Sequence, residues 1–272
     1  VFKMGVAGVA YATILAQFLS AALELIVLSR DNAPYGIRWP HVKIHREMLS
    51  RILKIGLPSA VQQTVTSFSN VFVQGYINSF GSACMAGWSS YGKLDGLILI
   101  PVQSIAMAST TFVGQNYGAR NMPRARKGAK QALLLSLGIT AVISLLVILF
   151  AHNLLLLFTS DPEVLYYGRR FIVMISPFYL LICFNQVFAG ALRGIGNAKA
   201  PVAVMLLSFV LFRQIYLYVN SLLGNSFTAV ALAYPVGWAL CSALLTVLYL
   251  RSALCRTQPA EQADAEAATT AQ

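Results

Sequence analysis

Three charged side chains lie well away from the ends of long apolar stretches of the sequence: Lys93, Asp95 and Arg213. A charge at the centre of a membrane helix costs about 2.5–3.5 kcal/mol on insertion scales, so such residues usually face a protein interior or a water-filled cavity. Lys93 and Asp95 are two positions apart and point to different sides of a helix. Asp95 is expected to have a polar role in function or structure. Arg213, midway along its stretch, either pairs with Asp95 or lines a cavity.

Residue patterns for catalysis or metal binding do not occur in the sequence. It contains no GxSxG, no HExxH and no paired aspartates in an apolar stretch, and the GxG at 194–196 follows a helical pattern rather than a strand. His41 and His45 lie in a basic segment without the glutamate of HExxH and are expected to be solvated. The four cysteines form no CxxC pair and are expected to be free. We predict a protein that is not an enzyme and has no metal or cofactor.

The elements that hold the three charges are long apolar spans. Hydrophobic residues make up 57% of the 272, the mean hydropathy is +0.67 and only 11% are charged, whereas a soluble domain has about 25%. Each span is long enough to cross a bilayer as a helix. We therefore predict an all-α, polytopic bundle of about seven transmembrane helices: Gly5–Ser29, Ile52–Asn78, Cys84–Gln115, Ala129–Phe158, Val164–Ala189, Val202–Leu222 and Thr228–Leu250.

The net charge of +11 is distributed unevenly between the loops. Most Lys and Arg residues lie in alternate connections, at 30–54, 120–130, 193–199 and 251–256, and the intervening loops hold none. This alternation is typical of loops that remain in the cytoplasm. It explains the positive charge without a nucleic-acid partner.

Four segments carry a family resemblance. KLDGLILIPVQSIAMASTTFVGQNYGA at Lys93–Ala119 resembles the eighth of twelve helices, with the following loop, of bacterial multidrug and toxic compound extrusion (MATE) transporters. GVAGVAYATILAQ at Gly5–Gln17 is similar to their sixth helix. KIGLPSA at Lys54–Ala60 is similar to the start of the seventh, and GALRGIGNAKAP at Gly190–Pro201 to the loop between the tenth and eleventh.

The resemblance implies two six-helix lobes in a V around a central cavity. It also implies export of organic cations or related amphiphiles in exchange for Na⁺ or H⁺. On this basis residues 1–30 are the last helix of the first lobe, 31–51 a cytoplasmic linker between lobes, 52–254 the six-helix second lobe and 255–272 a disordered cytoplasmic tail. The chain is then expected to need a missing N-terminal half as a partner, in the inner membrane of a bacterium.

The acidic residues that bind the coupling cation in one branch of the family are missing from this chain. One branch of the family binds the cation through acidic residues of the seventh and tenth helices, but 57–75 and 176–190 contain no Asp or Glu. The coupling ion is therefore expected to bind mainly in the missing first lobe. The cavity and substrate candidates are Thr66, Asn70, Lys93, Asp95, Met107, Asn185, Gln186 and Arg213. Of these, Met107 belongs to a residue type that in such spans mostly packs or faces lipid.

Two further features lie within the motif at 93–119. Pro101 removes a helical hydrogen bond and is a candidate kink or hinge. Gly114, Gln115, Asn116 and Gly118 are expected to form a helix C-terminal cap at the cytoplasmic surface. Two alternatives stay open for the function: a lipid-linked sugar flippase of the same superfamily, and a remnant that does not transport.

Overall fold

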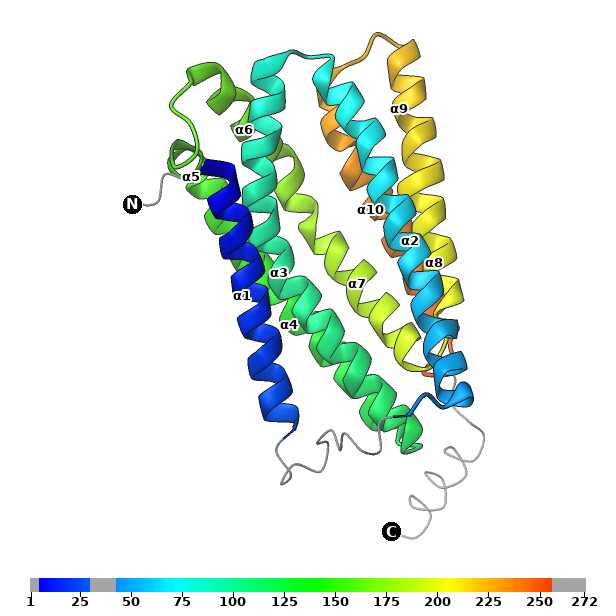
Figure 1. Ribbon diagram of the computed structural model, residues 1–272. Helices are drawn as coiled ribbons and strands as arrows, with labels where there is room; N and C mark the ends of the chain where they lie inside the picture. Colours follow the sequence, from blue (N-terminus) through cyan, green and yellow to red (C-terminus); the bar gives the residue numbers. More distant parts are fainter. Residues whose placement is uncertain (1–4, 30–42, 256–272) are drawn as a thin grey trace. The chain divides into compact units, whose positions relative to one another are not determined.

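The computed structural model describes residues 5–29 and 43–255, and all regular structure in these ranges is helical (Figure 1). The chain divides into two compact units, residues 1–52 and residues 53–272. The first holds α1 (Gly5–Leu28) and the start of α2 (Arg46–Asn78). The second holds the rest of α2 and all later elements. The predicted all-α class is confirmed.

Beyond α2, the described part of the second unit contains eight α-helices and two short segments of different helical type. The segment η2 is a 3₁₀ turn and η3 is a π-helix, in which the turn is wider than in an α-helix. In chain order the elements after α2 are α3 (Ser82–Gly118), α4 (Met122–Leu149), α5 (Ala151–Leu156), α6 (Pro162–Ile175), η2 (Ser176–Phe178), α7 (Tyr179–Gly194), α8 (Lys199–Leu206), η3 (Leu207–Phe212), α9 (Arg213–Leu222) and α10 (Phe227–Leu250).

Six spans in the described ranges are long and apolar enough to cross a membrane, so the chain is a multi-pass membrane protein. They are Ala10–Leu28, Ser82–Gly118, Met122–Leu149, Pro162–Gly194, Lys199–Leu222 and Phe227–Leu250. The seventh predicted span lies in α2, which has 33 residues but is less apolar than the other six. Thr66, Asn70 and Gln74, four residues apart, explain part of this difference because they form one polar stripe along the helix.

The boundaries of several elements differ from the sequence prediction. The span predicted at Ala129–Phe158 is interrupted at Phe150, which separates α4 from α5. The span predicted at Val164–Ala189 contains the 3₁₀ turn of η2, where Pro177 interrupts the α-helical hydrogen bonding. Helix α2 begins at Arg46, so the end of the predicted linker is helical. Residues 31–42 of that linker and nearly all of the predicted tail lie outside the described residues.

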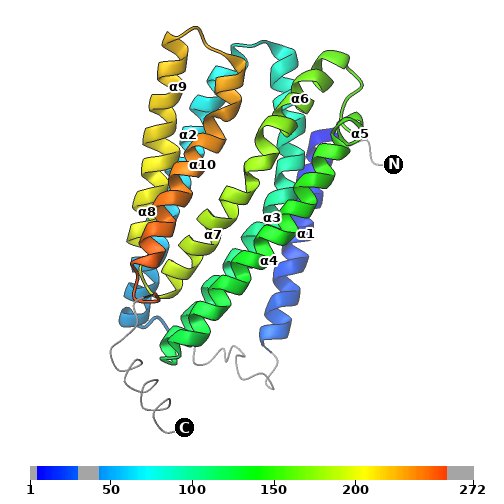
Figure 2. The same ribbon diagram turned by 180° about the vertical axis from the view of Figure 1, so that it is seen from behind.

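Helix α7 is central in the second unit and contacts α3, α4 and α10 (Figures 1 and 2). Small residues allow the close approach of α3 and α7. A β-carbon added to Gly194 would lie 2.8 Å from the carbonyl oxygen of Thr110 and 3.1 Å from the amide nitrogen of Gly114. A larger residue in place of these glycines would force the two backbones apart.

The basic connections gather at one end of the second unit. The turn from α3 to α4, the turn from α7 to α8 and the end of α10 lie together, and the turns from α2 to α3 and from α9 to α10 lie at the opposite end (Figures 1 and 2). Caps define several of these ends. Asn121 accepts a hydrogen bond from the Arg124 amide (3.1 Å), and Asp161 accepts one from the Glu163 amide (2.9 Å).

Candidate functional site

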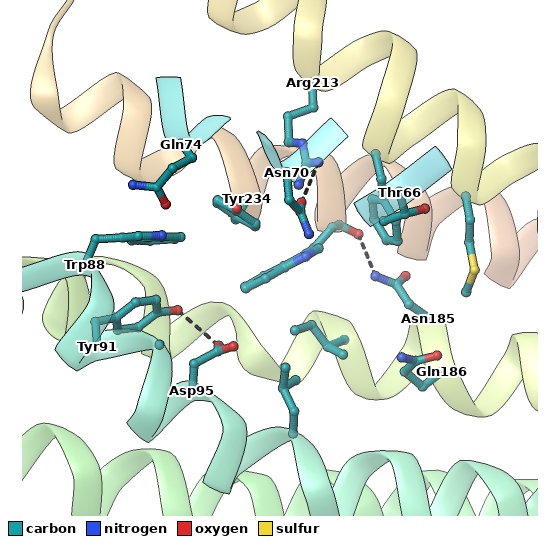
Figure 3. A pocket seen from close by; sticks show the side chains of 16 residues that line it. Thr66, Asn70, Gln74, Trp88, Tyr91, Asp95, Asn185, Gln186, Arg213 and Tyr234 are labelled. Atoms are coloured by element: carbon teal, nitrogen blue, oxygen red, sulfur yellow. Dashed lines mark hydrogen bonds between the residues drawn. The ribbon is translucent and has the colours of Figure 1, made fainter. Parts of the chain in front are cut away.

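A cavity of about 390 Å³ lies inside the second unit, between α2, α3, α7, the α8–η3–α9 rod and α10 (Figure 3). Its walls combine aromatic rings, amides and two charged groups. The lining residues are Thr66, Asn70, Gln74, Trp88, Tyr91, Gly92, Asp95, Leu99, Ile182, Asn185, Gln186, Met205, Phe209, Arg213, Tyr234 and Trp238. A cavity with this mixture suits an amphiphilic small molecule.

The carboxylate of Asp95 is held by two tyrosines. Tyr91, one helical turn earlier on α3, donates to Asp95 Oδ1 at 3.2 Å, and the hydroxyl of Tyr179 on α7 donates to the same oxygen. The two hydroxyl oxygens lie 2.7 Å apart, and both tyrosines are buried. Because an ionised carboxylate only accepts hydrogen bonds, two phenol donors match its charged form.

The guanidinium of Arg213 is held by α2 and α10. Its Nη2 donates to Ser69 Oγ and to Asn70 Oδ1, both at 2.8 Å, and its central carbon lies 4.8 Å from the centroid of the Tyr234 ring. Only 3% of Arg213 is exposed. Cation–π contact and two acceptors stabilise a charge that has left water.

Ser69 connects α2 to the rod that carries Arg213. Its hydroxyl donates to the Phe209 carbonyl at 3.0 Å and accepts from Arg213 and, at 2.8 Å, from Gln214 Nε2. This satisfies the one donor and two acceptor positions of a hydroxyl. The π-helix η3 ends directly before Arg213, which lies at this contact between α2 and the rod.

Three buried polar atoms that belong to lining residues have no hydrogen-bond partner: Thr66 Oγ1, Asn185 Oδ1 and Arg213 Nε. Asn185 is 2% exposed, and its amide nitrogen donates to the Trp238 carbonyl at 3.3 Å. Unsatisfied buried polar atoms cost about 1–3 kcal/mol each. Five serine hydroxyls among the described residues outside the cavity lining also lack a partner. A molecule bound in the cavity would offer partners to the three lining atoms.

Comparison with known proteins identifies the fold that contains this cavity. The MatE family profile matches residues 58–219, more than half of the chain. The chain belongs to the MatE family. The family's members are transporters, which agrees with the prediction that the chain is not an enzyme.

Several curated proteins are similar to this MatE chain. The probable multidrug resistance protein YpnP of Bacillus subtilis is 28% identical over 253 residues, which cover 92% of the chain and 56% of YpnP. The multidrug export protein MepA of Staphylococcus aureus is 22% identical over 259 residues, which cover 93% of the chain and 56% of MepA. The chain thus spans about half the length of the curated relatives it matches.

Solved structures share the MatE fold. A MOP superfamily transporter from Pyrococcus furiosus, described as having a binding pocket of reverse polarity, has a TM-score of 0.85 at 22% identity, over 94% of this chain and 58% of that one. A multidrug resistance MATE family transporter in an outward-facing conformation has a TM-score of 0.83 at 22% identity, over 93% of this chain and 58% of that one.

The MatE cavity brings together most of the candidates predicted from sequence. Thr66, Asn70, Asp95, Asn185, Gln186 and Arg213 all line it. Asp95 and Arg213 share the cavity but do not form an ion pair within the described part of the chain. Each has the neutral partners described above, so the arrangement corresponds to a cavity-lining Arg213 rather than a direct pair.

Two candidates lie elsewhere in the MatE chain. Lys93 is exposed, and its Nζ lies 4.7 Å from the centroid of the Phe158 ring. Its position two residues before Asp95 turns it to the far side of α3. Met107 is 72% exposed and borders a separate recess with Gln103, Thr111 and Arg193. Gln186 lines both the cavity and this recess.

The predicted hinge and cap also differ from expectation in part. Helix α3 is continuous through Pro101, and Figure 1 shows it changing direction about halfway along its length. Gly114 is a packing residue inside α3, not a cap. The carbonyls of Gln115 and Asn116 do accept terminal hydrogen bonds, from Ala119 and Asn121. The left-handed residue is Arg120 (φ 58°), and Gly118 is the last residue of the helix.

The aromatic wall of Trp88, Tyr91, Tyr234 and Trp238 was not predicted from the sequence. Aromatic residues are common in membrane helices, and their types do not separate packing from lining. One usable signal exists: Trp88, Tyr91 and Asp95 follow each other at spacings of three and four, which place them on one face of α3.

Proposed function

We propose that this chain forms one lobe of a multidrug exporter and that the cavity binds the exported organic cation or related amphiphile. The observation that carries the proposal is a carboxylate and a guanidinium held in one aromatic cavity inside a membrane bundle. Charges are retained in membrane segments mainly along ligand or ion pathways. The cavity volume falls within the range of about 300–1,000 Å³ typical of small-molecule sites. The descriptions of YpnP and MepA as multidrug proteins support the same function.

Transport by this lobe requires a second lobe and an ion gradient. The chain spans about half of its relatives, and alternating access needs two bodies that move against each other. We assign coupling to Na⁺ or H⁺ bound mainly by the other lobe, because 57–75 and 176–190 carry no acidic residue. The basic end of the bundle faces the cytoplasm, in the inner membrane of a bacterium.

A lipid-linked sugar flippase fits the cavity less well. Its substrate carries phosphate, for which a net positive cavity is expected. The cavity has one carboxylate and one guanidinium among its lining residues.

Efflux measurements test the proposal. The chain, joined to the part of YpnP that precedes the region it matches, is expressed in a drug-sensitive bacterium, and ethidium efflux is followed with and without an uncoupler. We expect gradient-dependent efflux from the joined protein and its loss in the Asp95→Asn variant. Membrane-inserted joined protein that gives no efflux of any cationic dye would refute the exporter and favour a remnant.

A further inference from the structure

The two charges of the cavity balance each other. Among its 16 lining residues, all within the described part of the chain, Asp95 is the only carboxylate, Arg213 is the only guanidinium, and there is no Lys or His. The formal charge of the lining is therefore zero when both groups are ionised. In a poorly hydrated cavity, a ligand with a net charge leaves one of these two wall charges without a counterpart.

In each charged group, the protein's hydrogen bonds involve a single terminal atom. Both hydrogen bonds to Asp95 end on Oδ1, so Oδ2 remains for a ligand donor. Both hydrogen bonds from Arg213 leave Nη2, and its Nε has no partner. Figure 3 shows Asp95 rising from α3 on one side of the cavity and Arg213 descending from α9 on the other. A ligand between them meets a negative group at one wall and a positive group at the other.

The aromatic groups lie near both charges. Trp88 contacts Tyr91 at 5.0 Å between ring centroids and Tyr234 at 5.4 Å, and Tyr179 stacks on Trp238 at 5.6 Å. Such rings bind organic cations by cation–π contact and also accept apolar ligand surface. They add affinity without adding charge.

From this balance we infer that the preferred ligand of the cavity is a zwitterionic amphiphile. Its ammonium group lies at Asp95 and the aromatic wall, and its carboxylate or other anionic group lies at Arg213. This deepens the proposed function and rests on it. A simple cation is attracted by Asp95 but repelled by Arg213. A simple anion is attracted by Arg213 but repelled by Asp95. A molecule with both groups gains both attractions, so Asp95 and Arg213 act as specificity-determining residues.

The chain supplies its own probe of binding, because its three tryptophans are Trp39, Trp88 and Trp238 and the last two line the cavity. In a Trp39→Phe background, the full 272-residue chain in lipid nanodiscs reports ligand through the fluorescence of the two cavity tryptophans. The ligands are three forms of one aromatic dipeptide, phenylalanyl-phenylalanine: the zwitterion, its amide (a cation) and its N-acetyl derivative (an anion).

We expect the zwitterion to quench the tryptophan fluorescence at a concentration about tenfold lower than either singly charged form. This ratio is equivalent to a difference of about 1.4 kcal/mol in binding free energy. Asp95→Asn should shift the preference to the anion, and Arg213→Gln should shift it to the cation. Glu163→Gln and Arg169→Gln, exposed residues outside the cavity lining, are matched controls that should keep the zwitterion first. Arg213→Lys retains the charge and should also keep the order if Arg213→Gln does not fold.

Two failures are distinguishable. If the amide binds best to the unsubstituted chain and to both charge variants, the zwitterion inference is wrong and the cavity selects cations, as the proposed function alone allows. If none of the three forms quenches Trp88 and Trp238, this cavity is not a ligand site, and both proposals fail for this lobe.

Discussion

Gly190 of α7 lies so close to Thr110 of α3 that a β-carbon on the glycine would be 2.7 Å from the threonine Oγ1 and 2.8 Å from the carbonyl oxygen of Ala106. The second of these atoms belongs to a helix backbone and cannot rotate away. The contact fixes the distance between two helices that both line the cavity.

Gly190→Ala should destabilise the bundle. Inserting a methyl group where no space exists typically costs about 1–3 kcal/mol, so the melting temperature of the purified protein in detergent should fall. The control is Gly138→Ala in α4, where nothing lies within 4 Å of the added carbon. That change should leave the melting temperature equal or raise it, because alanine is the better helix former. Equal behaviour of the two variants would contradict the close contact.

Tyr179→Phe should lower the melting temperature of the purified protein because Asp95 loses a hydrogen bond. The change removes a hydroxyl that donates to a largely buried carboxylate, and hydrogen bonds to charged groups contribute about 1.5–3 kcal/mol. The loss should be much smaller in an Asp95→Asn background, where the charge is gone. Tyr218→Phe, at a tyrosine that is 61% exposed, is the matched control. A loss of the same size with Asp95 and with Asn at 95 would place the role of Tyr179 elsewhere.

Arg213 should be energetically coupled to Asn70 more strongly than to Gln74. Arg213 donates to Asn70 Oδ1 at 2.8 Å, whereas Gln74 lines the same cavity and bonds to Asn78 on its own helix. Double-mutant cycles of thermal stability with Arg213→Gln, Asn70→Ala and Gln74→Ala separate the two. We expect a coupling energy of about 0.5–3 kcal/mol for the first pair and near-additivity for the second. Strong coupling to Gln74 would indicate that the wall rearranges as a unit.

Lys127 and Ser160 should lie on opposite sides of the membrane. Lys127 belongs to the basic start of α4 and Ser160 to the connection before α6, and both are exposed. In a background without the four native cysteines, Ser160→Cys should react with a membrane-impermeant thiol reagent in intact cells, and Lys127→Cys should react only after lysis. The reverse pattern would invert the topology.

The apolar spans were predictable because a bilayer requires both length and hydrophobicity, which are local properties of sequence. The interruption at Phe150 was not, since the run Leu154–Phe158 is as apolar as the helix before it and only tertiary packing decides where α4 ends. Pro177 marked the second interruption, but the prolines at 58, 101 and 235 lie in continuous helices. Proline alone therefore does not separate a break from a tolerated position.

The charged and amide residues of the cavity were predictable because polar groups are costly in a membrane segment and usually face a protein interior or a cavity. Thr66, Asn70, Asn185 and Arg213 satisfy this rule. Lys93 does not, because it is exposed and its ammonium lies over the aromatic ring of Phe158, outside the cavity lining. Tyr91, four residues before Asp95, is a local partner. The second partner, Tyr179, depends on contact between α3 and α7 and lies 84 positions away. No local pattern contains that information.

The wide turn of η3 has a consequence for changes in chain length. A π-helical segment typically accommodates one residue more than an α-helix of the same rise, so the helical faces before and after it stay aligned. Removing one lipid-facing residue there, such as Leu211 at 56% exposure, would convert the segment to regular α-helix and leave Arg213 directed at Ser69. The same deletion in the middle of α10 would rotate every later residue by about 100°. Deletion of one residue should therefore be tolerated at Leu211 and rejected in the middle of the regular α-helical spans.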